Sequence, residues 1–336
     1  MSEPIPSLEY SAVRNGGAGL IDLSARGRLL VSGSEAVTFL NGLITNDMKT
    51  LANTWMPAVF PNVQGRLLAA VRVIHRDDGF LIDTESATRD TVIKLLERFT
   101  LAGDFRLANL TQDTALLSIQ GAKAGEIMAV IFGETLASPG RNAVASVDWQ
   151  GKQITVIRAT HTAEDGFDLF VNATEAETLR DSFIKAGAPP IDDDTFETLR
   201  IEAGIARYGI DMDETNVVTE TNLDAAVSFT KGCYIGQEII ARIKYRGHVA
   251  KKLAGLIFES KVSPESGAKI FSSDDKEIGR VTSFAFSPHL KRTIALGYVK
   301  FDYLAAGTSV RVDSSGTKFV AAVAEFPFIR GSWYTD

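Results

Sequence analysis

Cys233 is the residue best suited to chemistry by its type and its setting. It is the only cysteine in 336 residues, and it lies in the stretch 231–238 between two glycines and close to Lys231. From Ile235 onward the isoleucines have the spacing of one helix face. We therefore expect Cys233 in a loop at or just before a helix N-terminus, where unpaired backbone N–H groups and the helix dipole favour an anion. A thiol in such a place ionises more readily, and the thiolate is the form that attacks carbon or binds a metal.

A second interpretation of Cys233 stays open. A free cysteine is among the most buried residue types, so the thiol can equally be a small structural side chain in front of an isoleucine-rich helix. Lys231 precedes it, however, and Arg242, Lys244 and Arg246 follow it. Because positive charge stabilises a thiolate, these residues favour a catalytic role for Cys233 with Lys231 as its companion.

The other residues that commonly do chemistry form no specific motif. The chain has neither a G-x-x-x-x-G-K-[ST] phosphate loop nor a glycine pattern for dinucleotide binding. Its histidines are far apart and lack metal-ligand spacing; they are His75, His161, His248 and His289. We therefore predict no metal site. A triad of Cys233 with one of these histidines is not excluded, but nothing specific supports it.

Composition and charge limit the class of protein. Apolar residues make up 45% and charged residues 23%, as in soluble globular proteins, and no run approaches the roughly 18 uninterrupted apolar residues of a membrane span. The net charge of -7 argues against nonspecific binding of nucleic acid. A single cysteine forms no internal disulfide, so we expect a cytoplasmic protein. The length predicts two or three domains.

The elements around these residues indicate an α+β protein. Strands over 66–74 and 80–83 are predicted to form a hairpin, and a helix follows over 92–99. A similar order of strand, helix, hairpin and helix recurs between residues 115 and 185, which favours two lobes of similar build. The stretch 208–230 lacks periodicity and is expected to be a long ordered loop that leads to the cysteine.

The last part of the chain is expected to contain strands alone. Six strands are predicted between residues 253 and 325, at even spacing and with Gly and Asp turns. This pattern favours a small barrel or sandwich as a separate domain. We place the boundary near residue 248, which divides the chain into 1–247 and 248–336.

The stretch 231–238 resembles the signature of the YgfZ family, folate-binding proteins of iron-sulfur cluster assembly that are similar to the T-protein of the glycine cleavage system. The resemblance spans nearly the whole chain, and the cysteine stretch is its most specific part. Further segments that resemble these families are 22–24, 39–40, 45–47, 62–66, 200–204, 208–211, 220–223, 279–283 and 295–299.

This resemblance implies a fold and a function. The fold would be a T-protein-like folate-binding region of two interlocked α+β lobes over 1–247, followed by a small C-terminal β-barrel over 248–336. The function would be that of a cytoplasmic, folate-binding accessory factor for iron-sulfur cluster assembly or repair, which supports tRNA-modifying iron-sulfur enzymes indirectly. Its partners would be a folate such as tetrahydrofolate and iron-sulfur assembly or client proteins, without direct nucleic-acid or membrane contact.

The T-protein itself implies an alternative function, a tetrahydrofolate-dependent aminomethyl or one-carbon transferase. The T-protein motif after the Asn-x-x-Gly turn carries a catalytic aspartate. Counted from Asn62 and Gly65, that carboxylate would fall at Ala69 or Ala70. A methyl group neither accepts a proton nor anchors a folate nitrogen, so transfer by the T-protein route is disfavoured. A transferase would have to use Cys233 or Asp168 instead, and a scaffold that has lost folate is a third possibility.

The resemblance also implies folate contacts. Asp168 would take the place of the acidic residue that binds the pterin ring, since a carboxylate can accept two N–H donors of an aminopyrimidine edge. The alternative is that Asp168 lies on the solvent face of a strand. Arg158, Tyr208 and Arg242 are expected to line the folate pocket or hold the glutamyl carboxylates, and Glu202 is a further expected folate-binding residue.

Overall fold

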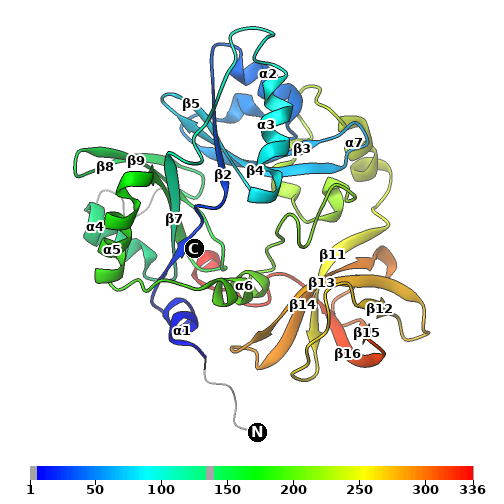
Figure 1. Cartoon of the computed structure of the whole chain (residues 1–336). Helices are drawn as coiled ribbons and strands as arrows, with labels where there is room; N and C mark the ends of the chain where they lie inside the picture. Colours follow the sequence, from blue (N-terminus) through cyan, green and yellow to red (C-terminus); the bar gives the residue numbers. More distant parts are fainter. Residues whose placement is uncertain (1–5, 134–139, 336) are drawn as a thin grey trace.

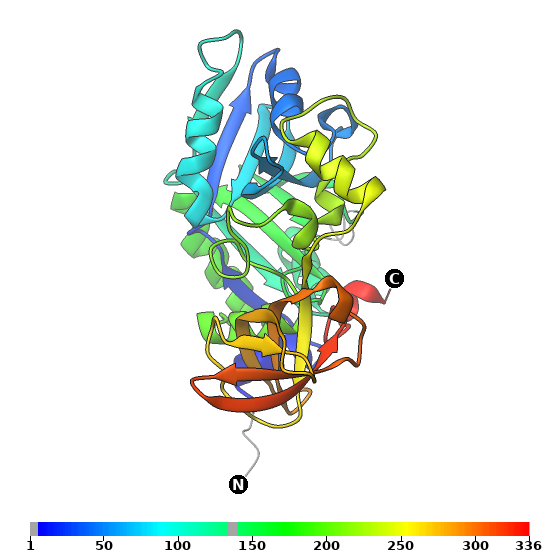
Figure 2. The same cartoon turned by 90° about the vertical axis from the view of Figure 1, so that its right-hand side faces the viewer.

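Two α+β lobes and a β-barrel surround a common centre in the computed structural model of the chain, which describes residues 6–133 and 140–335. In Figure 1, lobe 1 (residues 27–109) lies at the top, lobe 2 (19–22 and 114–185) on the left and the barrel (251–324) at the lower right. In Figure 2, lobe 1 and the barrel occupy opposite ends of the molecule. The α+β fold class with two similar lobes and a barrel is confirmed. None of the helices in the described part of the chain is long and apolar enough to cross a membrane.

Lobe 1 is an antiparallel sheet of five strands in the order β3-β4-β5-β2-β6 with two helices packed on it. The predicted hairpin forms as β4 and β5, and its turn needs Gly79 because a Cβ there would lie 2.3 Å from the carbonyl oxygen of Val31. The elements are β2 (Gly27–Ser32), α2 (Ala36–Leu43), β3 (Trp55–Pro61), β4 (Leu67–Arg76), β5 (Gly79–Thr84), α3 (Arg89–Glu97) and β6 (Arg106–Asn109).

Lobe 2 repeats this build, but it takes its first strand from the beginning of the chain. The order of its antiparallel sheet is β1-β7-β10-β9-β8, so β1 lies beside β7 and lobe 1 is inserted between them in the sequence. Its core contains Leu179 and Phe183 of α5, four residues apart on one helix face. The elements are β1 (Gly19–Asp22), β7 (Thr114–Gln120), α4 (Ala124–Phe132), β8 (Val144–Trp149), β9 (Lys152–Arg158), β10 (Gly166–Asn172) and α5 (Ala176–Lys185).

Three further helices connect the units. α1 (Leu8–Arg14) and α6 (Asp193–Glu202) lie together beside lobe 2, and α6 also contacts the barrel strands β13 and β14. The expected long loop leads from α6 to the cysteine and contains only short turns, among them Val218–Glu220 and Asp224–Ala226. α7 (Gln237–Arg246) follows the cysteine and packs on lobe 1.

The C-terminal strands form a closed barrel in the order β11-β14-β13-β12-β15-β16, with β16 paired to β11. All six predicted strands are present, and the choice between barrel and sandwich is settled for the barrel. Residues beyond β16 leave the barrel and return to lobe 2, where the backbone N–H of Trp333 donates to the carbonyl oxygen of Ala163. The strands are β11 (Lys251–Phe258), β12 (Lys269–Phe271), β13 (Glu277–Ser287), β14 (Arg292–Lys300), β15 (Ser309–Ser314) and β16 (Thr317–Ala324).

Candidate functional site

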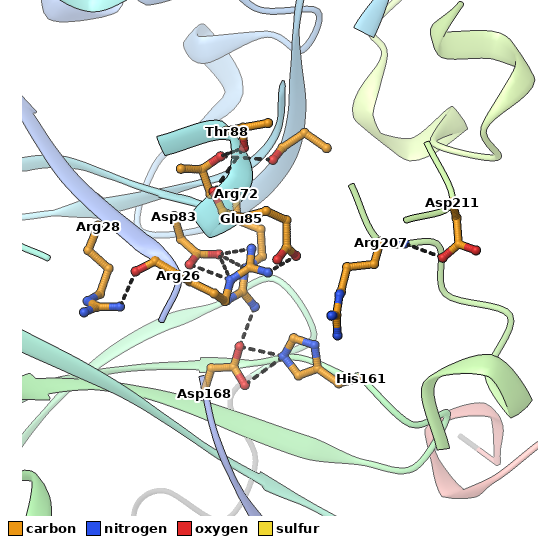
Figure 3. Close-up of polar contacts among 12 residues, drawn as sticks. Arg26, Arg28, Arg72, Asp83, Glu85, Thr88, His161, Asp168, Arg207 and Asp211 are labelled. Carbon is orange, nitrogen blue, oxygen red and sulfur yellow. Dashed lines mark hydrogen bonds and ion pairs between the residues drawn. The ribbon is translucent and has the colours of Figure 1, made fainter. Parts of the chain in front are cut away.

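A chain of alternating charges crosses from lobe 1 to lobe 2 (Figure 3), and its three central members are buried. We call it the charge chain, and its members in order are Glu85, Arg26, Asp83, Arg72, Asp168 and His161. Arg26 Nη2 and Arg72 Nε each lie 2.7 Å from Asp83 Oδ2. Arg72 Nη1 also donates to Asp168, Arg26 donates to Glu85, and His161 Nε2 lies 2.9 Å from Asp168 Oδ2.

The strand registers place these charges. Arg72 of β4 and Asp83 of β5 are direct cross-strand partners, so their side chains leave the sheet on the same side. Asp168 lies on β10, the middle strand of the other sheet. Arg72 therefore joins the two lobes by binding one carboxylate from each.

Both central carboxylates are ionised. Burial on its own would raise the pKa of Asp83, but the nearby guanidinium groups of Arg26 and Arg72 lower it to about 2. Burial would likewise raise the pKa of Asp168, and the contacts that His161 and Arg72 make with its carboxylate hold it well below its usual range. The site thus contains two fixed negative charges in a place from which solvent is excluded.

A hollow of about 580 Å³ opens beside the charge chain, between the lobes and α6. We call it the central hollow; it is lined by residues from the segment 22–26, the turn 85–87, His161, the first turns of α6 and the segment 205–210. Arg26, Glu85 and His161 thus belong both to the charge chain and to the wall. The volume falls in the range of small-molecule sites, roughly 300–1,000 Å³.

Asp168 lies differently from both sequence expectations. It is fully buried, so the solvent-face alternative is wrong. Its two oxygens are held by Arg72 and by His161 Nε2, at 2.9 and 3.1 Å from the imidazole nitrogen, and His161 rather than Asp168 lines the central hollow. Asp168 therefore lies behind the wall of the central hollow, with the side chain of His161 between it and the hollow.

Tyr208 is the predicted folate residue that does line the central hollow. Its hydroxyl donates to the carbonyl oxygen of Leu67 at 3.2 Å. Burial, reinforced by the carboxylates of Glu214 and Asp213, raises its pKa to about 12, so the phenol stays protonated. The lining also includes Arg207, whose side chain is 39% exposed and whose Nη1 lies 3.3 Å from Glu197 Oε2.

Glu202 and Arg158 are placed away from the central hollow. Glu202 is fully buried and accepts from Tyr10 Oη at 2.7 Å, Arg14 Nε at 2.9 Å and Ser287 Oγ at 2.5 Å. These bonds tie α1 and the barrel to α6, so Glu202 has a structural role, and its expected folate contact stays a prediction. Arg158 binds Asp165 at 2.7 Å, on the side of lobe 2 where the C-terminal segment packs.

The cysteine loop, residues 231–238, lies on lobe 1. Cys233 is exposed, and α7 begins only at Gln237, so the thiol lies farther from the helix N-terminus than the isoleucine spacing predicted. Gly236 delays the helix because it has φ +78°, and a Cβ there would lie 2.3 Å from the carbonyl oxygen of Asn62. The backbone N–H of Ile235 donates to Gly42 at 3.2 Å. The thiol is thus presented to solvent by a loop fixed to lobe 1.

Lys231 anchors this loop. Its buried ammonium donates to the carbonyl oxygens of Asn41, Ile44 and Asn46 at 2.7, 2.9 and 2.6 Å. Burial lowers its pKa to about 8. All three bonds of this amine go to the backbone of lobe 1. The expected role of Lys231 in activating the Cys233 thiol stays a prediction.

Arg242 lies on the exposed side of α7, where it pairs with Glu238 at 3.2 Å. Neither Arg242 nor Cys233 lines the central hollow. Of the sequence-predicted residues, Tyr208 lines the hollow and Asp168 lies directly behind its wall. Cys233 and Lys231 belong to the cysteine loop, Arg242 lies on the helix that follows it, and Glu202 and Arg158 lie at neither place.

The two alanines on β4 face opposite sides of the sheet. Ala69 is buried in the core of lobe 1, whereas Ala70 packs toward the cluster that contains Tyr208 and Tyr234. A carboxylate at 69 would be buried without a partner, so only position 70 is suited to carry a group toward the centre. At that position the chain has a methyl group.

Sequence reasoning missed Arg26, Arg72, Asp83, His161 and Arg207. A signal existed for Arg72 and Asp83, because each charge interrupts a predicted strand with mostly apolar neighbours, and buried charges require partners. No local pattern could pair them with Asp168, which is distant in the sequence. Within residues 6–133 and 140–335, no group of three or more His, Cys, Asp or Glu side chains is arranged to hold a metal ion.

Comparisons with known proteins agree with this architecture. The GCVT N-terminal domain matches residues 3–231, and the glycine cleavage T-protein C-terminal barrel domain matches residues 251–329. An aminomethyltransferase of Rubrobacter xylanophilus is 31% identical over 293 residues, which cover 87% of this chain and 78% of that protein. One from Shouchella clausii is 30% identical over 331 residues, or 96% and 89% of the two chains.

A solved structure extends the agreement to the fold. The glycine cleavage system aminomethyltransferase T from Bartonella henselae has a TM-score of 0.85 with this chain at 23% identity, and the match covers 96% of this chain and 89% of the other. Both lobes and the barrel thus have counterparts in one known fold. Together with the domain matches, this shows that the chain belongs to the glycine cleavage T-protein family.

Proposed function

We propose that the chain binds a tetrahydrofolate in the central hollow and acts in folate-dependent one-carbon chemistry. One observation carries the proposal: a hollow of suitable size lies between the two lobes of a T-protein fold, and a charged polar network forms part of its wall. Relatives that cover most of this chain are named aminomethyltransferases. They favour one-carbon transfer over a role confined to iron-sulfur proteins.

The wall offers suitable groups for a folate. His161 and the protonated Tyr208 are polar groups for the heterocycle, while Arg207 is a partly exposed cation for the glutamyl carboxylates. Arg207 thereby takes the part first expected of Arg158 and Arg242.

Ala70 limits the mechanism that this proposal allows. With a methyl group where a carboxylate would face the centre, a transferase must move its proton through another group. The ionised Asp168 is already bound to Arg72 and His161, and Cys233 does not line the hollow. A reaction by the carboxylate route of the T-protein is therefore disfavoured.

A second candidate is favoured by the exposed thiol. A reactive cysteine needs access, and Cys233 has it while its loop is held rigidly by Lys231. Under this candidate the chain is a cytoplasmic, YgfZ-like accessory factor for iron-sulfur cluster assembly or repair, and its effect on tRNA-modifying enzymes is indirect. Because clusters are usually held by about four protein ligands, a partner chain or second copy would complete any site at Cys233.

Calorimetric titration of tetrahydrofolate into the purified protein tests the folate proposal. We expect saturable binding at micromolar ligand, and its absence would contradict the proposal. Ala87 is exposed at the wall of the hollow, so Ala87→Trp should fill the space and weaken binding at least tenfold. Ala306→Trp, at an exposed position of the barrel, is the matched control and should bind as the wild type does.

An activity assay separates the two candidates. Purified protein is supplied with an aminomethyl-lipoyl donor and tetrahydrofolate, and methylene transfer is measured by the release of ammonia. Robust turnover would support the transferase and contradict the accessory factor. Folate binding without turnover would favour the accessory factor.

A further inference from the structure

His161 stands between the charge chain and the central hollow. Its Nε2 lies 2.9 and 3.1 Å from the two oxygens of Asp168, and its backbone N–H donates to Gln120 Oε1 at 2.8 Å. The ring also packs edge-on against Phe196, with centroids 6.4 Å apart. The contacts with Asp168 and Phe196 thus hold the imidazole, and the backbone bond fixes the segment that carries it.

The other ring nitrogen of His161, Nδ1, is available to bind a ligand. In Figure 3, Nδ1 of His161 points away from Asp168, toward the side on which Arg207 lies. Across the described residues, no hydrogen bond to this nitrogen is formed, and His161 lines the hollow. Because the carboxylate of Asp168 is ionised, Nε2 carries the proton that is donated to it. In the neutral ring Nδ1 is then an acceptor.

Asp168 is poorly placed to bind a ligand itself. It is fully buried, and a ligand would have to displace Arg72 or His161 from it. Arg72 already has one buried guanidinium nitrogen, Nη2, without a hydrogen-bond partner among the described residues. The loss of Asp168 would leave this buried cation with Asp83 alone, and breaking a buried ion pair is strongly destabilising.

We propose that His161 Nδ1 accepts a hydrogen bond from the aminopyrimidine edge of the folate heterocycle, and that Asp168 acts through His161 as a positioning residue. This inference rests on the proposed folate site. It assigns the direct contact to a histidine and moves the acidic residue to the layer behind it. The ligand class is a heterocycle that presents N–H donors.

Two amide substitutions test the assignment because they replace different ring nitrogens. The amide of His161→Asn lies near the position of Nδ1, whereas the amide of His161→Gln reaches the position of Nε2 and preserves the contact with Asp168. We expect His161→Asn to retain most of the affinity for tetrahydrofolate and His161→Gln to lose about tenfold, the value of one hydrogen bond of about 1.4 kcal/mol. Calorimetry measures both.

A purely structural role for His161 predicts the opposite order, because only glutamine keeps the bond to Asp168. Equal affinities or the reversed order would overturn the inference. If the wild type itself binds no folate, the proposed function fails instead, so the two failures are distinguishable. Thermal unfolding of each variant reports whether it is folded.

Nitrogen NMR of the unmodified protein provides a second measurement that needs no variant. With ¹⁵N-labelled histidine, addition of tetrahydrofolate should shift the Nδ1 resonance of His161 and leave its Nε2 resonance nearly in place. A shift confined to Nε2, or none at saturating folate, would overturn the inference.

Discussion

The cysteine loop and the charge chain place their chemistry in opposite ways. The loop is one continuous stretch whose reactive group, Cys233, is exposed while its anchor, Lys231, is buried. The charge chain draws its members from several strands and turns of both lobes and buries three of the six, Asp83, Arg72 and Asp168. The cysteine loop is therefore recognisable from adjacent residues in the sequence, whereas the charge chain forms only when the two lobes have folded together.

Breaking the charge chain at its centre should have the largest effect on stability. Asp83→Asn leaves the cations Arg26 and Arg72 without the buried carboxylate that they share, so we expect a loss of about 3–5 kcal/mol in the free energy of unfolding. Urea denaturation at pH 7 measures it. Asp78→Asn, which alters a partly exposed ion pair with Arg76, should cost about 1 kcal/mol or less.

The acid dependence of Asp83→Asn adds a check. Because the folded pKa of Asp83 is lowered from 3.8 to about 2, its contribution is fully present above the unfolded value and is lost as the pH falls toward 2. The wild type should thus lose about 2 kcal/mol more than the variant between pH 5 and pH 2. If the free energies of unfolding of the wild type and the variant fell equally with pH, Arg26 and Arg72 would not stabilise the ionised form of Asp83.

Displacing the cysteine loop should have a smaller effect. Gly236→Ala forces a Cβ against the carbonyl oxygen of Asn62 at a residue with positive φ, and we expect a loss of about 1–3 kcal/mol. Gly232→Ala is the matched control, since no atom lies within 4 Å of its Cβ position and its φ is not in the left-handed range. Equal stabilities in thermal unfolding would mean that the loop is not fixed to the 62–65 turn.

Replacing the thiol of Cys233 should have the smallest effect on stability, but it tests the accessory-factor candidate directly. Cys233→Ser should change the free energy of unfolding by no more than about 0.5 kcal/mol, because the side chain is exposed. Folate affinity should also be unchanged. If the accessory-factor candidate is right, the variant fails to restore iron-sulfur enzyme activity in cells that lack the protein. Full restoration would return Cys233 to a structural role.

The fold was largely predictable because its signals are local. The β4–β5 hairpin and the barrel strands follow from short apolar runs separated by Gly and Asp turn residues, and all appear near their predicted positions. The start of α7 was placed too early, since the spacing of Ile235 does not reveal that Gly236 adopts a left-handed conformation.

The site was less predictable because it depends on long-range pairing. The resemblance pointed to Tyr208, which lines the central hollow, and to Asp168, which lies behind His161. A motif does not show which side chain shields another. Glu202 illustrates the same limit: its neighbours in the sequence give no sign that Tyr10, Arg14 and Ser287 converge on it.

The pairing of β1 with β7 has a consequence for synthesis on the ribosome. β1 (Gly19–Asp22) emerges early, but β7 (Thr114–Gln120) follows only after every strand of lobe 1 has been made. Lobe 1 can complete its own sheet during that interval, since domains fold as units from the N-terminal side. β1 must meanwhile wait with an unpaired edge, the kind of surface that invites wrong partners. The lobe that contains Asp168 and His161 is thus the later of the two to assemble.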